Sequence, residues 1–186
     1  WADAQARALE PVWRQRRRAS HVRACHGDLH LDNLVLLDGE VVAFDCVEFD
    51  ERLRTTDTVA DIAFTTMDLK ARGRPDLAHA LLDDYLQASG DYAGVAVLGF
   101  YEVYRALVRA MVDGMRRACG AAGGDDSPYL PWARQATDAT RVAPPLVLMH
   151  GLSGSGKSTV ARALVEQGGA IRLRSDVERK RLHGLD

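Results

Sequence analysis

The sequence predicts a mainly helical fold with one small β-hairpin, followed by a truncated α/β unit. Two short apolar stretches rich in β-branched residues flank Asp38-Gly39, which is a strong short-range signal for a hairpin. Segments beyond this hairpin carry apolar residues at helical spacing. Further along, the apolar run at 146–149 precedes a glycine-rich turn and a helical pattern, as a buried strand leading into a helix does.

The first expected helix spans residues 1–19. Pro11 either kinks this helix or starts a second segment. The basic run from Arg14 to Arg18 is interpreted as a solvated helix face, with a nucleic-acid contact as the minor alternative. The apolar residues of the segment are Trp1, Leu9, Val12 and Trp13.

Three helical patterns follow the hairpin, at 57–69, 75–88 and 94–120. The last is apolar around much of its circumference, so we expect a largely buried helix of roughly 20 residues. Gly120 and residues 121–126 end it.

A further helix is expected over 127–141, with Ser127 as N-cap and Pro128 at the first helical position. The sequence VAPP at residues 142–145 predicts a linker. Beyond the linker we expect two strands at 146–150 and 170–173, a helix at 157–167, and a last helix with Ser175 and Glu178 as its capping box.

The composition is that of a soluble globular protein, with 47% hydrophobic and 27% charged residues. The formal net charge of −2 gives no overall attraction to nucleic acid or to an anionic membrane. Cys25, Cys46 and Cys119 are widely spaced, so we expect no disulfide framework and a reducing, cytoplasmic setting. No apolar run approaches the ~20 residues of a membrane span. Because the chain lacks an initial methionine and stops inside a motif, we interpret it as a fragment.

The stretch CHGDLHLDNLVLLDGEVVAFD at 25–45 concentrates polar residues around the hairpin. His26 and His30 have the spacing of two zinc ligands on a helix, but the strand beginning at Asn33 favours a loop. A Cys25–His26 nucleophile pair is weaker, because neighbours in an extended segment point in opposite directions. The third interpretation is phosphoryl transfer, which needs a carboxylate to accept a hydroxyl proton and oxygen ligands for Mg²⁺.

The spacing of Asp28 and Asn33 fits the third interpretation. An aspartate followed five positions later by an asparagine, and then by another aspartate, is the pattern of a kinase catalytic site. A three-residue hairpin loop puts Asn33 opposite Asp45, whereas a two-residue loop puts it opposite Phe44, with Asp45 one residue beyond. Either register leaves Asn33 and Asp45 within reach of one cation. The simpler alternative is that these groups only cap turns and strand ends.

HGDLHLDN, followed by FDCVEFD, resembles the catalytic and metal-binding segments of the aminoglycoside phosphotransferase and choline kinase-like superfamily. The resemblance covers residues 1–141 and implies the C-terminal lobe of a protein-kinase-like fold. It implies ATP as phosphoryl donor, Asp28 as catalytic base, and Asn33 and Asp45 as magnesium ligands. The family's N-terminal lobe, which grips the nucleotide, has no counterpart before residue 25, so we expect this segment alone to be weakly active or inactive.

The same resemblance implies supporting roles for three other residues. His26 shapes the loop, and Glu48 is a further metal- or substrate-side carboxylate. Asp61 is the acid that braces the catalytic loop through backbone hydrogen bonds. For Asp61, and for Asp57, a helix N-terminal charge is the equally weighted alternative.

GLSGSGKS at 151–158 matches the phosphate-binding pattern G-x-x-x-x-G-K-[ST] at every fixed position. Its glycines permit a tight turn, after which backbone N–H groups and a helix N-terminus face the phosphates. Lys157 reaches the β- and γ-phosphates, Ser158 offers a ligand to Mg²⁺, and Thr159 supports the α-phosphate side. A flexible linker is the alternative. The expected nucleotide-binding residues are Gly151, Ser153, Gly154, Ser155, Gly156, Lys157, Ser158 and Thr159.

This second segment looks like small-metabolite P-loop kinases of the gluconate or shikimate kinase type. The resemblance implies that Asp176, after the second strand, holds the substrate hydroxyl, and that Arg179 is a substrate- or phosphate-side cation. Helix capping and a solvated helix face are the alternatives for these two residues.

The sequence thus predicts three parts: a kinase-like domain at 1–141, a linker at 142–145 and the start of a P-loop domain at 146–186. The leading hypothesis is part of an ATP- and Mg²⁺-dependent phosphotransferase acting on a small hydroxylated metabolite. One alternative is a nucleotide-sensing or regulatory module beside a P-loop ATPase. Another is a metal-dependent hydrolase built on His26, Asp28 and His30.

Overall fold

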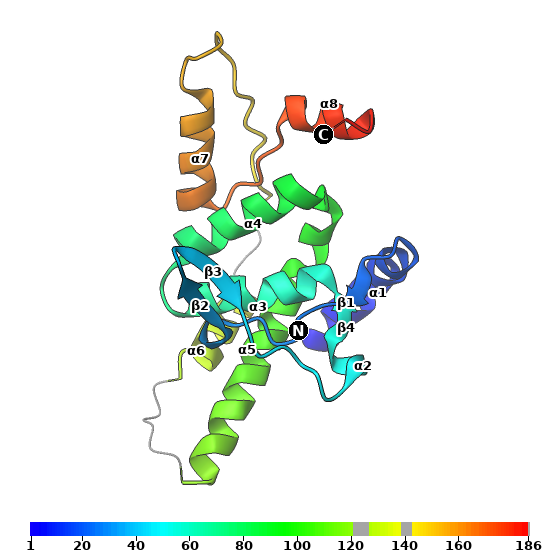
Figure 1. Cartoon of the computed structure of the whole chain (residues 1–186), viewed down its shortest axis with the longest axis vertical. Coiled ribbons are helices and arrows are strands. Elements are labelled where there is room, and N and C mark those ends of the chain that lie inside the picture. Colours follow the sequence, from blue (N-terminus) through cyan, green and yellow to red (C-terminus); the bar gives the residue numbers. More distant parts are fainter. Residues whose placement is uncertain (121–126, 139–142, 186) are drawn as a thin grey trace.

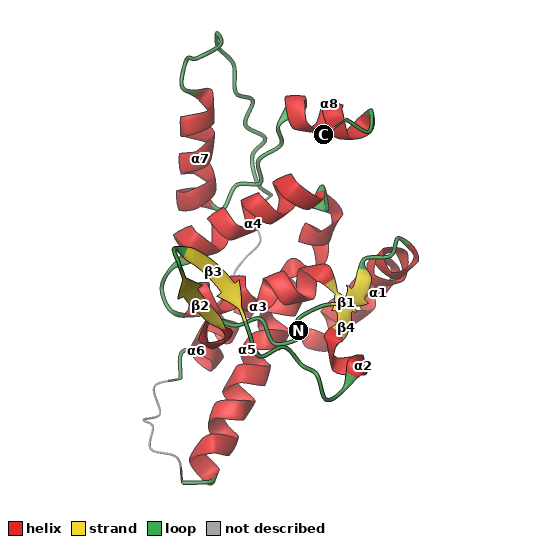
Figure 2. Cartoon of the chain, viewed as in Figure 1, coloured by secondary structure: helices red, strands yellow, loops and turns green. Residues whose placement is uncertain are grey.

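The protein is described here by a computed structural model that covers residues 1–120, 127–138 and 143–185. These residues are mainly helical, with two small antiparallel sheets, which confirms the predicted fold class (Figures 1 and 2). The strands are β1 (Val22–Ala24), β2 (Leu34–Leu37), β3 (Glu40–Ala43) and β4 (Thr55–Asp57). The helices are α1 (Ala2–Arg18), α2 (Glu51–Arg54), α3 (Thr58–Ala71), α4 (Pro75–Ser89), α5 (Val95–Ala118), α6 (Tyr129–Asp138), α7 (Lys157–Gly168) and α8 (Ser175–Leu182), with short 3₁₀ turns η1 (Leu31–Asn33) and η2 (Tyr92–Gly94).

Helix α3 lies at the centre of the first part of the chain. Its sequence mixes small and apolar residues all round, so α4, α5 and α6 can pack against it on several sides. Phe64 and Met67 are fully buried, and burial of each such side chain contributes ~1.5–3 kcal/mol. The buried apolar residues form two clusters around α3: Val59, Ala63, Leu82, Leu86, Val97 and Leu98, and Phe64, Met67, Val103, Ala106, Tyr129 and Ala133.

The basic run of α1 is not a solvated face throughout, so that prediction is wrong for Arg16. Arg16 lies on the same face as Val12 and Trp13, one turn further along, and is buried. Its guanidinium donates to both carboxylate oxygens of Asp57 and of Asp91 at 2.6–2.8 Å. These buried ion pairs tie α1 to the start of α3 and to the turn after α4. Pro11 does not break the helix, because α1 runs continuously through it.

The hairpin of β2 and β3 has the shorter of the two expected loops. Leu37 pairs with Glu40 and Leu34 with Ala43, so only Asp38 and Gly39 form the turn. Both have positive φ, 50° and 87°, as a type I′ turn requires. The apolar side chains of this hairpin are largely exposed, Leu36 at 68% and Val41 at 70%.

A second antiparallel pair, β1 with β4, is a feature that the sequence did not predict. Val22 pairs with Asp57 and Ala24 with Thr55. The pair is short and joins residues more than 30 positions apart, so no local pattern indicates it. It fixes the start of the 25–33 loop beside the N-terminus of α3.

Helix α5 is confirmed in extent, but only one face of it is buried, and no residue of the helix after Arg109 is buried. Val103 and Ala106 are buried, whereas Tyr104, Met111 and Met115 are exposed. Figure 1 shows the second half of α5 extending away from the core. The helix ends at Ala118, and residues 121–126, which we expected to end it, lie outside the described residues.

Helix α6 begins later than expected. Ser127 is not its N-cap, since its hydroxyl donates to Asp113 Oδ2 at 2.8 Å. The first helical bond runs from Trp132 N–H to the Pro128 carbonyl, so Pro128 precedes the helix. Residues 139–141 and the first linker residue lie outside the described part of the chain.

The C-terminal part forms α7 as predicted, but neither expected strand is formed in residues 143–185. Residues 146–150 and 170–173 have no ladder of hydrogen bonds, and Leu146 and Leu148 are 87% and 83% exposed. A strand needs paired neighbours and covered faces, which two apolar segments alone do not provide. The predicted capping box is also wrong, because Arg174 occupies the N-cap position and Ser175 is the first residue of α8.

The C-terminal part packs on α4. Val165 of α7 is only 1% exposed, and the Glu166 carbonyl lies 3.1 Å from His79 Nδ1. Arg172 forms an ion pair with the buried Asp83, and Arg181 donates to the Gln87 carbonyl at 2.6 Å. None of the helices in the described residues is both long and apolar enough to cross a membrane.

Candidate active site

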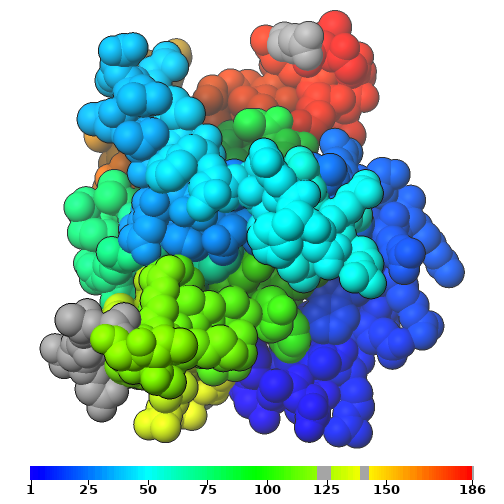
Figure 3. Space-filling view, turned by 60° about the horizontal axis from the view of Figure 1, so that its bottom comes forward, coloured from blue at the N-terminus to red at the C-terminus, as the bar shows by residue number. Residues whose placement is uncertain are grey.

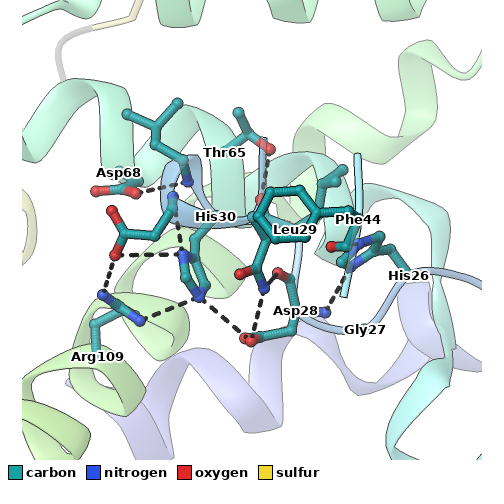
Figure 4. A network of polar contacts seen from close by, with 12 residues as sticks. His26, Gly27, Asp28, Leu29, His30, Phe44, Thr65, Asp68 and Arg109 are labelled. Carbon is teal, nitrogen blue, oxygen red and sulfur yellow. Dashed lines mark hydrogen bonds and ion pairs between the residues drawn. The ribbon is translucent and has the colours of Figure 1, made fainter. Parts of the chain in front are cut away.

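The loop at 25–33 connects β1 to β2 and lies along α3 (Figure 4). Three polar side chains of α3 hold its backbone. Asp61 accepts from the N–H groups of His26 and Gly27 at 2.7 and 2.9 Å. The Thr65 hydroxyl donates to the Leu29 carbonyl at 2.6 Å, and Asp68 accepts from the Leu31 N–H at 2.9 Å. Because positions 61, 65 and 68 share one helix face, α3 fixes the whole loop.

Gly27 is required by this arrangement. Its φ is +86°, a conformation that residues with a Cβ rarely adopt. A Cβ at this position would also lie 3.1 Å from Val47 Cγ2 and 3.2 Å from Arg54 Cα. Only a glycine at position 27 therefore lets the loop backbone pass this close to Val47 and Arg54. Asp28 is the next residue in the loop.

The Asp28 carboxylate lies at the end of the braced loop. Asn33 Nδ2 donates to the Asp28 carbonyl at 2.9 Å and to Oδ2 at 3.1 Å. His30 Nε2 lies 3.3 Å from the same Oδ2. This contact with His30, assisted by Asn33 and by the charge of Arg109, holds the pKa of Asp28 below its usual range, although partial burial opposes the shift. Asp28 is therefore ionised at neutral pH.

His30 is itself fixed from two sides. Its ring is buried against Phe64, and Nδ1 accepts from the Asp32 N–H at 3.2 Å. Arg109 of α5 lies 3.1 Å from Nε2 and pairs with Asp32 at 2.9 Å. Partial burial raises the pKa of Asp32, but Arg72 and Arg109 outweigh burial and lower it.

A cavity of about 910 Å³ opens beside Asp28. Asp45, Cys46 and Glu48 line it together with α5 residues. Asp45 has a φ of +57°, which is uncommon outside glycine and is a strain found at functional sites. Both Asp45 and Glu48 are exposed, and Glu48 lies 3.9 Å from the Cys46 thiol.

Asn33 and Asp45 could hold a hard cation. In the hairpin register the Phe44 N–H bonds to the Asn33 carbonyl, so Asp45 lies one residue beyond the position opposite Asn33. Within the described residues, neither the side-chain oxygen of Asn33 nor the Asp45 carboxylate accepts a hydrogen bond from a protein group. Free amide and carboxylate oxygens next to Asp28 fit Mg²⁺, which prefers oxygen ligands.

The histidines do not form a zinc site. His26 Nε2 lies 2.8 Å from the Phe44 carbonyl, and its Nδ1 is 3.4 Å from the Asp28 N–H. Both ring nitrogens of His30 are likewise in contact with protein groups. No group of three His, Cys, Asp or Glu suited to a metal exists in residues 1–120, 127–138 and 143–185. The hydrolase alternative has no support in this geometry.

The glycine-rich loop at 151–156 leads into α7. Gly151, Gly154 and Gly156 all have positive φ, between 76° and 146°. Lys157 Nζ donates to the carbonyls of Gly151 and Leu152 at 2.8 and 2.6 Å. The other predicted nucleotide-binding residues, Ser153, Ser155, Ser158 and Thr159, are exposed around this turn.

Asp176 and Arg179, the predicted substrate residues, lie on α8. Asp176 is exposed and pairs with Arg174 at 2.8 Å. Neither residue forms a hydrogen bond or ion pair with the glycine-rich loop within the described part of the chain. The structure does not bring them to this loop, and their role stays a prediction.

Several residues that position Asp28 were not predicted from the sequence. Thr65 and Asp68 follow Asp61 at helical spacing, so an unusual row of polar residues in an otherwise apolar helix was an available signal. Arg109 had no such signal, because it reaches His30 across 79 positions of sequence.

Comparisons with known proteins match both parts of the chain. Residues 1–98 match the family described as "Phosphotransferase enzyme family", and residues 146–186 match "AAA domain". "Uncharacterized protein Rv2004c" of Mycobacterium tuberculosis and "Uncharacterized protein Mb2027c" of Mycobacterium bovis are each 41% identical over 159 residues. This alignment covers 84% of the chain and 32% of each relative, so the chain spans about a third of their length. No solved structure matches.

Proposed function

Because the chain belongs to the phosphotransferase enzyme family, we propose that it is part of an ATP-dependent kinase that phosphorylates a hydroxyl group of a small molecule. The observation that carries the proposal is the Asp28 carboxylate, kept ionised by His30 and Asn33 at the edge of a cavity large enough for a metabolite. Fold alone does not identify the acceptor.

In the proposed reaction Asp28 acts as general base. Its carboxylate accepts the proton of the acceptor hydroxyl, whose oxygen forms the new bond to the γ-phosphorus while the bond to the departing ADP breaks. The transition state of such transfers is loose, so positioning matters more than a strong base. A carboxylate with a low pKa, held by a braced loop, meets that requirement.

Asn33 and Asp45 are the proposed magnesium ligands, and Glu48 is a third candidate oxygen ligand or a substrate contact. When bound, the ion neutralises charge on the phosphates. Asn33 also orients Asp28 through its amide nitrogen. One side chain thereby links the metal position to the position of the base.

The segment after residue 145 is proposed to form a second nucleotide site. Gly154 and Gly156 shape the turn, Lys157 contacts the β- and γ-phosphates, and Ser158 offers its hydroxyl to Mg²⁺. We place the domain boundaries as the sequence suggests, with a kinase-like domain at 1–141, a linker at 142–145 and a P-loop domain at 146–186.

A regulatory role for the kinase-like domain is the second candidate. The packing of α7 and Arg172 on α4 favours it, since that contact joins the two proposed nucleotide sites in one body. In this alternative only the P-loop site turns over.

Single substitutions in the full-length protein separate the two candidates. ATP consumption is followed with a panel of sugars, polyols and amino alcohols. Kinase action at the first site predicts that Asp28→Asn abolishes acceptor-dependent consumption while Lys157→Ala leaves it. The regulatory alternative predicts loss with Lys157→Ala alone, a result that would reject the first candidate.

A further inference from the structure

Helix α5 forms one wall of the cavity that contains Asp28. Tyr104, Arg105, Val108 and Val112 line it from this helix, opposite the segment that carries Asp45 to Phe49. In Figure 3 the segment around residue 50 (cyan) and the second half of α5 (green) border the same face of the molecule. This wall is apolar apart from Arg105 and the Tyr104 hydroxyl.

Arg105 differs from the buried arginines of this fold. Arg16 is held by two carboxylates, and Arg109, one turn after Arg105, pairs with Asp32. Arg105 forms no ion pair with any carboxylate of the described residues. Its Nε donates weakly to the Ala60 carbonyl at 3.4 Å, and its guanidinium lies 4.7 Å from the centre of the Phe64 ring.

The guanidinium of Arg105 is therefore positioned but not neutralised. Its Nη groups make no hydrogen bond within the described residues, although arginine has five N–H donors. Burial lowers the pKa of Arg105. The negative charges of Asp61 and Asp28, which form no ion pair with it, oppose this shift. Arginine stays protonated even so. A partly desolvated guanidinium with no carboxylate in direct contact favours the binding of an anion in the cavity.

We propose that Arg105 binds an anionic group, a carboxylate or a phosphate, on the acceptor whose hydroxyl Asp28 deprotonates. The acceptor class is then a hydroxylated acid or a phosphorylated sugar or polyol, not an amine. Tyr104, Val108 and Val112 contact its carbon skeleton. This inference rests on the proposed function and names the substrate class of the same site.

The test uses full-length protein carrying Lys157→Ala, which silences the P-loop site. Three acceptor pairs differ mainly by one anion: glycerate and glycerol, gluconate and glucitol, glucose 6-phosphate and glucose. We expect kcat/KM to favour the anionic member of at least one pair. In that pair, Arg105→Met raises KM for the anionic member on the order of 30- to 100-fold and leaves KM for the neutral member within about threefold.

Two further variants keep the result interpretable. Arg105→Lys preserves the charge, so it retains part of the preference and shows that the protein still folds. Arg74→Met removes an exposed arginine that, among the described residues, pairs only with Asp76, and it should leave every KM unchanged. A comparison of the gluconate and glycerate arms with the glucose 6-phosphate arm distinguishes carboxylate from phosphate.

Three outcomes count against the inference. Preference for neutral or amine acceptors overturns it, and so does an equal loss of kcat for all acceptors in Arg105→Met, which assigns the arginine to the transferred phosphoryl group. Both leave Asp28-dependent transfer intact. If Asp28→Asn does not lower transfer from ATP to any acceptor, the proposed function fails and the inference fails with it.

Discussion

The loop at 25–33 and the glycine-rich loop at 151–156 both carry proposed phosphate chemistry, but they are held in different ways. The first is braced by Asp61, Thr65 and Asp68 of the buried helix α3. The second is exposed, and its turn is closed by its own Lys157. A self-contained loop can be recognised from a short motif, whereas a braced loop depends on residues far along the chain.

Of the variants that test this difference between the two loops, Asp61→Ala is expected to have the largest combined effect on stability and turnover. Two loop N–H groups lose a charged acceptor, so we expect the free energy of unfolding to fall by about 2–3 kcal/mol. Misplacement of Asp28 should lower acceptor-dependent turnover on the order of 100-fold. Denaturant unfolding and ATP-coupled kinetics measure the two effects. Asp76→Ala, which removes an exposed carboxylate, is the control; equal effects of both variants would show that the loop is not braced by α3.

Two glycines of nearly equal φ sharpen the same contrast. Gly27→Ala adds contacts to Val47 and Arg54 to the cost of a left-handed φ, so we expect a loss of about 3 kcal/mol. Gly156→Ala meets no atom within 4 Å and should lose only about 1 kcal/mol. Thermal unfolding of both variants gives the order. A larger loss for Gly156→Ala would contradict this account.

The pH dependence of turnover reports on the bracing of Asp28. Its pKa is lowered, so activity persists above that pKa and is lost as the pH falls through it. Any stabilisation of the folded state by the lowered pKa has the same pH dependence. It is present above the pKa of Asp28 in the unfolded state and is lost as the pH falls through its pKa in the folded state. His30→Ala removes the first cause, so the acidic limb of kcat/KM should move to higher pH. The control is His183→Ala, which changes an exposed position and should leave the acidic limb of kcat/KM at the same pH. If the acidic limb of the His30→Ala protein is also unchanged, His30 does not lower the pKa of Asp28.

The smallest effect on stability is expected for Lys157→Ala. Within the described residues its Nζ contacts only exposed loop groups, two carbonyls and the Ser155 hydroxyl, so the unfolding free energy should change by less than about 0.5 kcal/mol. Nucleotide binding at the second site should nevertheless be lost. Isothermal titration with ATP in an Asp28→Asn background measures this; a strongly destabilised variant would mean that the loop is part of a packed core.

Local chemistry made the hairpin and both motifs predictable. Asp38-Gly39 sets a turn, and the glycine pattern at 151–156 carries its own positive φ values. The ion pairs of Arg16 were missed, because Asp57 and Asp91 are 41 and 75 positions away and only tertiary packing brings them together. The strands at 146–150 and 170–173 were predicted from apolarity alone, but a strand also needs hydrogen-bonded neighbours.

The candidate site likewise has a part that could be predicted from the sequence and a part that could not. The spacing of Asp28, Asn33 and Asp45 predicts phosphoryl transfer, and the hairpin register determines how near Asp45 lies to Asn33. Arg109 of α5, which contacts His30, and Asp68 of α3, which holds the loop at Leu31, meet the loop only in the folded chain. Sequence spacing contains no information on such contacts.

The most direct test of the central claim is phosphoryl transfer itself. Phosphorus NMR follows the phosphorylated acceptor formed from ATP by full-length Lys157→Ala protein, with and without Asp28→Asn. If Asp28 is the base at the kinase-like site, the near-isosteric change lowers the transfer rate by about 10²- to 10⁴-fold while the protein stays folded. Transfer at an unchanged rate by the Asp28→Asn protein would contradict this assignment.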